Sequence, residues 1–141
     1  APGRASRAIV DPFLVASCLD GVLAQRLVRR ICQSCRVHDT PSQADLDALG
    51  IRASADVTLY KGKGCDDCRG TGYRGRSAIY EMFVIDEDAR SLMLRRASAP
   101  DIRVHAIERG MTTLRLDGWQ RACEGVTTVE EILRVTQEDA S

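Results

Sequence analysis

Two cysteine pairs, Cys32-x-x-Cys35 and Cys65-x-x-Cys68, constrain this chain more than any other feature of its sequence. The pairs are separated by residues 36–64, a stretch of 29 residues. A two-residue spacing lets one tight turn present two thiolates to a metal ion, and two such pairs complete a tetrahedral four-thiolate shell. The spacing therefore predicts a structural Zn²⁺ site whose ligands are Cys32, Cys35, Cys65 and Cys68.

Glycines flank the second pair in the segment GCDDCRGTGYRGR. Gly64 and Gly70 allow sharp turns around the sulfurs because glycine adopts positive φ without steric cost. A closed shell of four protein ligands has no open coordination position, so the metal is expected to shape the fold and to do no chemistry. His38 could replace one ligand, but the full set of four cysteines makes that replacement unnecessary.

Two disulfides or two redox dithiols are the alternative interpretation of the same cysteines. Disulfides are typical of secreted proteins, and nothing else in this sequence is typical of a secreted protein. Redox pairs of this spacing usually accompany a βαβ pattern, which neither pair follows. These observations favour the metal site.

The charge balance argues against a nucleic-acid-binding protein. Lys+Arg and Asp+Glu both number 20, and only six residues are aromatic, whereas such proteins usually show a basic excess and stacking aromatics. No apolar run approaches the roughly 18 residues of a membrane span. The sequence begins without methionine, which indicates a fragment, and residues 1–9 are expected to be disordered or to be a cloning addition.

Local patterns before residue 86 predict two helices and three strands. Asp11 caps a first helix that Gly21 ends. Ser42 caps a second helix, which ends at Gly50. The apolar patterns predict strands over Val22–Val28, Val57–Tyr60 and residues 73–84.

After Asp86 the pattern is helical. Capping residues and terminal glycines predict helices over Glu87–Arg96, from Ser98 to Gly110, over Thr113–Glu124, and from a capping box at Thr127 or Thr128 through Val135.

The predicted fold is α+β and mostly helical. A small antiparallel sheet pairs Val22–Val28 with Arg76–Val84, residues 32–72 form a zinc-binding insertion between them, and a helical bundle follows. A zinc ion at the base of the insertion would offset the cost of ordering so long a loop. Beyond residues 1–9, the expected divisions are 10–31, 32–72, 73–85 and 86–141.

The sequence offers no catalytic or cofactor-binding residue. It has no Gly-x-x-x-x-Gly-Lys-[Ser/Thr] loop to hold phosphates and no His-Glu-x-x-His. His105 is expected to be a partly exposed surface residue, and Glu130-Glu131 to act as helix-capping acids. Cys18 and Cys123 are expected to be buried free thiols.

Arg26, Arg29 and Arg30 form a basic cluster before the first cysteine pair. The simpler interpretation is a solvated face that balances the negative charge of a zinc tetrathiolate. The alternative is contact with an anionic group across an interface, and the sequence leaves the role of the cluster open.

Several stretches together resemble the C-terminal part of the type II secretion ATPases (general secretion pathway protein E) and the related type IV pilus assembly ATPases. The resemblance spans roughly residues 10–136. It is carried by Val10–Ser17, Val22–Arg29, the two cysteine pairs, Gly70-Thr71-Gly72-Tyr73-x-Gly75-Arg76, Ile79-Tyr80-Glu81, Gly110-Met111, Leu114-Arg115, Gly118, Gly125, Thr127-Thr128-x-Glu130-Glu131 and Arg134-Val135.

The resemblance implies a cytoplasmic, hexameric, RecA-like motor that hydrolyses ATP with Mg²⁺ to drive pseudopilus or pilus assembly. It implies that residues 10–31 end the RecA-like motor domain and that the four paired cysteines are the zinc ligands. The implied partners are the rest of the ATPase, neighbouring subunits and inner-membrane platform proteins, so the protein would be peripheral to the membrane without spanning it.

The family's nucleotide-binding motifs are missing from this sequence, so the chain alone is expected not to hydrolyse ATP. Two further interpretations are a zinc repeat of DnaJ-type co-chaperones and a free-standing zinc-ribbon interaction module. Only the second pair fits the co-chaperone repeat Cys-x-x-Cys-x-Gly-x-Gly, and the zinc-ribbon module lacks an evident binding face. The sequence does not separate secretion from pilus assembly.

Overall fold

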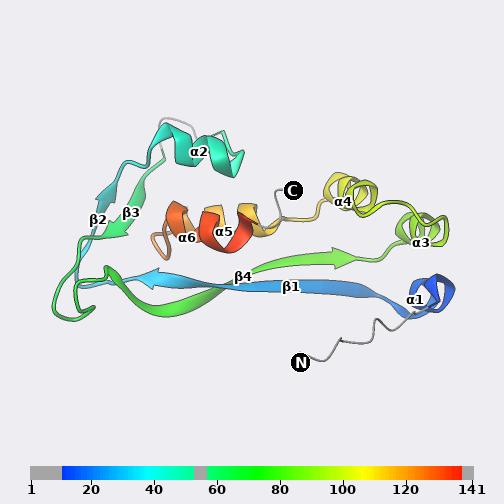
Figure 1. Ribbon diagram of the computed structural model, residues 1–141, viewed down its shortest axis with the longest axis horizontal. Coiled ribbons are helices and arrows are strands. Elements are labelled where there is room, and N and C mark those ends of the chain that lie inside the picture. Colours follow the sequence, from blue (N-terminus) through cyan, green and yellow to red (C-terminus); the bar gives the residue numbers. More distant parts are fainter. Residues whose placement is uncertain (1–10, 53–56, 138–141) are drawn as a thin grey trace, which may run out of the picture. The chain divides into compact units, whose positions relative to one another are not determined.

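The computed structural model describes residues 11–52 and 57–137, and the expectation for residues 1–9 lies outside them. The described residues form six helices and four strands, which confirms a mixed fold of helices and small antiparallel sheets (Figure 1). The chain divides into two compact units. One comprises Ala1–Val22 with Met82–Met111, and the other comprises Leu23–Glu81 with Thr112–Ser141.

The long strands β1 (Gly21–Ile31) and β4 (Tyr73–Val84) pair in one sheet, as the sequence predicts. Their arrows run in opposite directions in Figure 1. The prediction that Gly21 ends the first helix is wrong, because Gly21 is the first residue of β1. A Cβ atom at Gly21 would lie 3.3 Å from the carbonyl oxygen of Phe83, so the close approach of the two strands favours glycine there.

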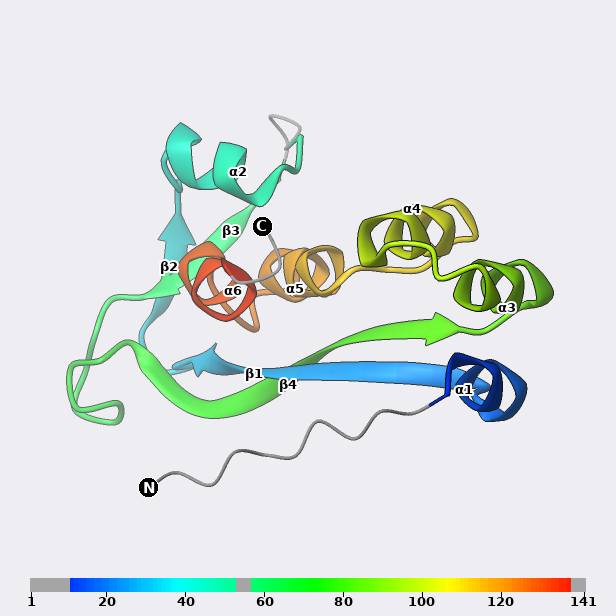
Figure 2. The same cartoon turned by 45° about the vertical axis from the view of Figure 1, so that its right-hand side comes forward.

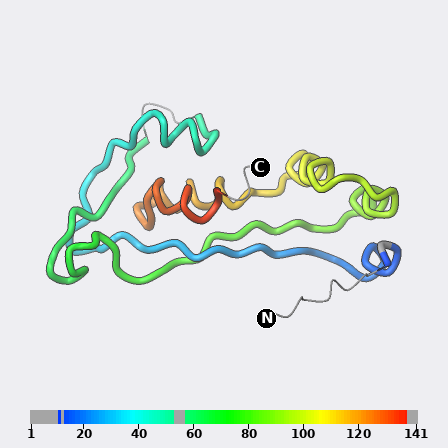
Figure 3. Tube along the Cα trace, viewed as in Figure 1, coloured from blue at the N-terminus to red at the C-terminus, as the bar shows by residue number. Residues whose placement is uncertain are grey.

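A second sheet joins β2 (Arg36–Asp39) to β3 (Leu59–Gly62) in antiparallel register, with His38 opposite Tyr60. The sequence predicts β3 two residues early and does not predict β2. The segment RVHD of β2 carries a single aliphatic residue, so its strand conformation depends on pairing with β3. Figure 3 follows the chain from β1 through β2 and back through β3 to β4.

The unit that contains the β2–β3 sheet and the larger part of β1 and β4 also contains three helices, which Figure 2 shows from a second side: α2 (Gln43–Leu49), α5 (Leu114–Cys123) and α6 (Val129–Thr136). Each begins at a side-chain cap, and these caps are Ser42, Thr113 and Thr128. The cap at Ser42 is predicted, Thr128 is one of the two predicted positions for the last helix, and Thr113 is predicted only as the first residue of its helix.

The core of this unit lies between α2, β3, α5 and α6. Its buried members are Leu49, Leu59, Ala122, Val129 and Ile132. Helix α5 meets α6 closely at Gly118, where a Cβ atom would lie 3.0 Å from the Ile132 side chain. A second cluster of buried residues, Val28, Ile79 and Leu114, packs the β1–β4 sheet against the start of α5.

The other unit contains α1 (Pro12–Cys18), α3 (Glu87–Leu94) and α4 (Ala99–Glu108). Asp11 and Ser98 accept backbone hydrogen bonds as the predicted caps of α1 and α4. Arg90 of α3 donates to the carbonyl oxygen of Ala16, which attaches α3 to α1. The four C-terminal helices thus belong to two units, α3 and α4 to one and α5 and α6 to the other.

Candidate metal centre

The first cysteine pair occupies the turn between β1 and β2. Cys32 follows the last residue of β1, and Cys35 precedes the first residue of β2. The second pair lies in the connection from β3 to β4, which runs from residue 63 to residue 72. Both pairs are therefore held where two strands end and two begin.

The four cysteine sulfurs converge as the sequence predicts. All four lie within 4.8 Å of one another. The separations are 3.8 Å for Cys32–Cys65, 3.9 Å for Cys35–Cys68 and 3.7 Å for Cys65–Cys68. A tetrahedron with Zn–S bonds of about 2.3 Å has edges of about 3.8 Å, so the sulfurs fit a zinc ion.

Disulfide bonds do not explain these positions. A disulfide joins two sulfurs at about 2.05 Å, and all six cysteines, every one among the described residues, are free. His38, the alternative ligand, lies outside the cluster and stacks on Tyr60 at a ring-centroid distance of 5.3 Å.

Backbone hydrogen bonds connect the two cysteine turns. The Cys32 N–H donates to the Gly72 carbonyl oxygen at 2.9 Å, and the Lys63 N–H donates to the Cys35 carbonyl oxygen at 3.1 Å. The chain crosses itself between Gly62 and Gly72, where a Cβ atom on Gly72 would lie 2.4 Å from the Gly62 carbonyl oxygen. Only glycine allows this approach.

Backbone N–H groups also point at the sulfurs. Gly64 donates to Cys35 Sγ at 3.3 Å, while Cys65 and Gly72 both donate to Cys68 Sγ at 3.2 Å. Burial acts to raise the pKa of Cys68, but these N–H groups lower it to about 6. Burial raises the pKa of Cys35 to about 11, although the Gly64 N–H opposes the shift. Backbone N–H groups that donate to a sulfur stabilise its thiolate form, which is the form that binds a metal ion.

The polar contacts that surround the sulfurs are not among the features predicted from the sequence. The Ser34 hydroxyl donates to Asp67 at 2.5 Å and joins the middle of one cysteine turn to the middle of the other. The Thr71 hydroxyl donates to the Cys68 carbonyl oxygen at 2.7 Å. Serine, aspartate and threonine near a Cys-x-x-Cys pair are the only signal in the sequence that could have indicated these contacts.

The arginine cluster does not act as one group. Arg29 forms an ion pair with the fully buried carboxylate of Glu131 at 2.9 Å, and its guanidinium lies 4.1 Å from the Tyr73 ring centroid. Arg26 is exposed and donates to the Gln25 carbonyl oxygen. The expectation of a capping role for Glu131 is incomplete, because this residue is a buried ion-pair partner.

The prediction that Cys18 and Cys123 are buried is wrong, since both are exposed. Helix α5 buries Leu114, Gly118 and Ala122, which follow one another at four-residue spacing. Cys123 is one residue past Ala122, so a rotation of about 100° carries it off the buried face. Neither thiol belongs to the cluster of four sulfurs.

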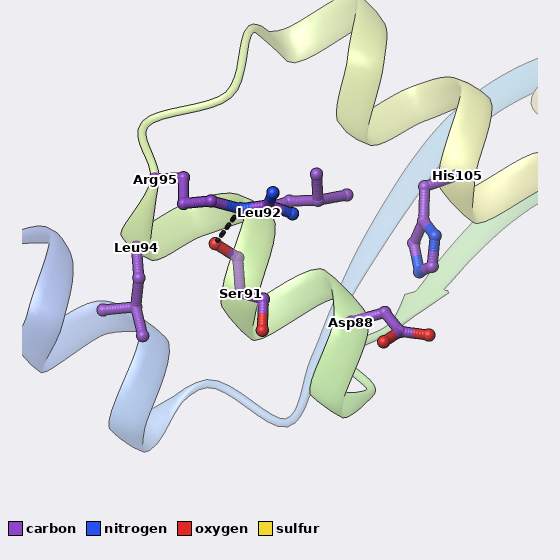
Figure 4. A pocket seen from close by; sticks show the side chains of 6 residues that line it. All are labelled: Asp88, Ser91, Leu92, Leu94, Arg95 and His105. Carbon is purple, nitrogen blue, oxygen red and sulfur yellow. Dashed lines mark hydrogen bonds between the residues drawn. The ribbon is translucent and has the colours of Figure 1, made fainter.

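A pocket of about 610 Å³ in the other unit is a weaker candidate site. It is lined by Asp88, Ser91, Leu92, Leu94, Arg95 and His105 (Figure 4). The His105 ring, half-buried, is 3.1 Å from a carboxylate oxygen of Asp86, the residue that caps α3, and Arg109 pairs with Asp88. These polar contacts therefore hold α4 to α3.

Comparison with known proteins supports the resemblance seen in the sequence. A model of the family "Type II/IV secretion system protein" matches residues 1–134. The chain is 46% identical over 132 residues to the type IV pilus assembly ATPase PilB of Thermus thermophilus and 44% identical over 130 residues to the type II secretion system protein E of Pseudomonas aeruginosa. The type II secretion system ATPase E of Vibrio cholerae is 36% identical over 132 residues.

Each of these alignments covers 92% of this chain, but only 15%, 26% and 25% of the three relatives, respectively. The chain therefore spans about a quarter or less of their length. Among the helices of residues 11–52 and 57–137, none combines the length and the apolar character that a membrane crossing requires.

Proposed function

Because the chain belongs to the type II/IV secretion system protein family, we propose that it is the zinc-bearing C-terminal region of an ATPase that powers type II protein secretion. The whole protein would be a cytoplasmic hexamer with a RecA-like motor domain, and residues 10–31 would end that domain. Its partners would be neighbouring subunits and the inner-membrane platform proteins of the secretion machine. The names of the relatives support this assignment.

The cysteine cluster is the observation that carries the proposal. Four sulfurs at tetrahedral spacing lie within the segment that the family shares. Cys32, Cys35, Cys65 and Cys68 would hold Zn²⁺, which would supply a redox-inert cross-link between two distant turns. Since all four coordination positions would be filled, the role of the site is structural.

Pilus assembly is the second candidate function. The pilus assembly ATPase of Thermus thermophilus is 46% identical to this chain, against 44% for the secretion protein of Pseudomonas aeruginosa. The two functions would share the same zinc site and the same fold, so the choice between them depends on the rest of the machine.

Metal analysis tests the site directly. We expect one zinc per chain in freshly purified protein and a loss of bound zinc in Cys65→Ser. The matched control, Cys123→Ser, changes an exposed cysteine outside the cluster and should keep one zinc. Protein with well below one equivalent of zinc and with disulfides by mass spectrometry would contradict the site.

Two assays test the motor assignment. The isolated chain should release no phosphate from ATP above background, because its sequence lacks the loop that holds phosphates. A secretion ATPase that contains this segment should lose secretion when Cys65 is replaced by serine. The same ATPase can be introduced into a strain that lacks its own secretion ATPase and into a strain that lacks its own pilus assembly ATPase. The strain whose function it restores would separate the two candidate functions. Normal function of a metal-free protein would overturn the proposed role of zinc.

A further inference from the structure

The chain leaves the cysteine site through Gly72 and enters β4 at Tyr73. The Gly72 carbonyl oxygen accepts from the Cys32 N–H at 2.9 Å, and the Gly72 N–H donates to Cys68 Sγ at 3.2 Å. Gly72 is thus bonded to both cysteine turns. The position of Tyr73, the next residue, therefore depends on how well the four sulfurs are held together.

The Tyr73 side chain reaches the start of helix α6. Its hydroxyl is 2.7 Å from the hydroxyl of Thr128, the residue that caps α6 and that accepts from the Glu131 N–H at 3.2 Å. Burial raises the pKa of Tyr73, so the phenol stays protonated at neutral pH. One neutral hydrogen bond therefore connects the segment after the cysteines to the first turn of α6.

Arg29 makes a second connection to the same turn. Its backbone N–H donates to Glu131 at 2.7 Å, its Nε donates to the same carboxylate at 3.0 Å, and its carbonyl oxygen accepts from the Thr127 hydroxyl at 2.9 Å. The Glu131 side chain is fully buried and also accepts from Arg134. A buried carboxylate without such partners would be strongly destabilising.

The two connections meet at Tyr73. The Arg29 guanidinium, about half-exposed, lies over the Tyr73 ring at 4.1 Å from its centroid. The ring thus limits the orientations of the arginine that pairs with Glu131. Arg29 lies three residues before Cys32, and Tyr73 lies five residues after Cys68. Contiguous contacts therefore run from the sulfurs through Gly72, Tyr73 and Arg29 to α6.

We propose that Tyr73 couples occupancy of the cysteine site to the attachment of helix α6. Metal binding fixes Gly72 and Tyr73, and Tyr73 in turn holds Thr128 and the Arg29–Glu131 pair. Because coupling between two binding equilibria is reciprocal, weakening the attachment of α6 must also weaken metal binding. This inference rests on the zinc site proposed above and identifies helix α6 as the element whose attachment depends on the metal.

Zinc affinity, measured by competition with a chromophoric chelator, tests the coupling. Tyr73→Phe removes only the hydroxyl, and the loss of one hydrogen bond should weaken zinc binding about five-fold. Hydrogen exchange supplies a second readout: backbone amides of α6 should exchange faster when a chelator removes zinc from the unsubstituted chain. Thr128→Ser keeps the hydroxyl and should bind zinc within about two-fold of the unsubstituted chain.

Tyr60→Phe is the matched control. Tyr60 also has an arginine over its ring, Arg36 at 4.9 Å, but it lies on β3 and pairs with His38. The zinc affinity of the Tyr60→Phe variant should equal that of the unsubstituted chain. The coupling alone would be overturned if Tyr73→Phe bound zinc as tightly as the unsubstituted chain. It would also be overturned if removal of zinc by the chelator left the hydrogen-exchange rate of the α6 amides unchanged. Failure of the unsubstituted chain to bind Zn²⁺ or Co²⁺ would overturn both the coupling and the zinc site.

Discussion

The cysteine site and the apolar core lie in the same compact unit but are stabilised by different forces. The core buries aliphatic side chains from α2, β3, α5 and α6, and its cohesion follows from the area removed from water. Residues 62–73 offer glycines, acids and cysteines instead, and their conformation depends on converging sulfurs and on one backbone crossing. Removal of the metal and removal of a core side chain should therefore act first on different parts of the chain.

The largest expected effect is the loss of a metal ligand. Cys65→Ser should abolish stoichiometric zinc and should increase hydrogen exchange first in residues 32–35 and 62–73, because binding free energy at such a site is folding free energy. The amides of α5 should stay protected longer, since the apolar core keeps its own contacts.

Ile132→Ala is the matched change in the core. Ile132 is fully buried, so its truncation should lower the free energy of unfolding by about 2–5 kcal/mol. The folded protein should still bind one zinc, with the somewhat weaker affinity that the coupling to α6 requires. If both variants lost zinc and helix protection to the same extent, the two regions would be one cooperative unit and the contrast between them would fail.

Gly72→Ala should have the next largest effect, and it tests the backbone crossing. The new Cβ would lie 2.4 Å from the Gly62 carbonyl oxygen, and the φ of +81° is strained for alanine. We expect about 3 kcal/mol lower stability in urea unfolding, together with weaker zinc binding.

Gly70→Ala is the control for this change. Its φ is +76°, but no atom beyond its two chain neighbours lies within 4 Å of the new Cβ, so the substitution should cost only about 1 kcal/mol. Equal costs at the two glycines would mean that positive φ matters and the crossing does not.

Much of this unit could be predicted from sequence, because the deciding signals are local. The spacing of Cys32, Cys35, Cys65 and Cys68 indicates their convergence, and the helix caps Ser42 and Thr128 follow from side-chain chemistry within four residues. Strand β2 could not be predicted, since its conformation depends on pairing with residues of β3 that lie 20 to 26 positions away in the sequence.

The burial of Glu131 could not be predicted for a similar reason. Its partner Arg29 is 102 residues distant, and a glutamate at the start of a helix is already explained by capping. The exposed position of Cys123 differs from expectation because an apolar sequence neighbourhood does not specify which face of a helix is buried.

Acidification should have a smaller effect that can be assigned to Glu131. Burial acts to raise the pKa of this carboxyl, but hydrogen bonds from Arg134 and Arg29 lower it to about 2, below the usual 4.5. A depressed pKa contributes stability above the unfolded-state pKa, and that stability is lost as pH falls from about 5 to about 2. Urea unfolding at several pH values should show this loss.

The Glu131→Gln variant separates the stability contributed by the Glu131 carboxylate from the stability lost when acid releases zinc. The variant should be less stable at pH 7 by about 2–3 kcal/mol. The difference in the free energy of unfolding between this variant and the unsubstituted chain should become smaller below pH 5. A difference that stays constant with pH would show that the carboxylate charge is not what stabilises α6.

The smallest effects are expected at the two cysteines outside the cluster. Cys18 and Cys123 are exposed, so Cys18→Ala and Cys123→Ala should change the free energy of unfolding by no more than about 0.5 kcal/mol and should leave zinc content at one per chain.

The same geometry predicts the order of thiol alkylation. Iodoacetamide should modify Cys18 and Cys123 first, while metal coordination protects the four clustered sulfurs until a chelator is added. Mass spectrometry after partial labelling would therefore count two reactive thiols with zinc bound and six without it. Early labelling of Cys65, the most exposed of the four, would mean that the metal does not hold all four sulfurs, and it would weaken the distinction between the cysteine site and the rest of the chain.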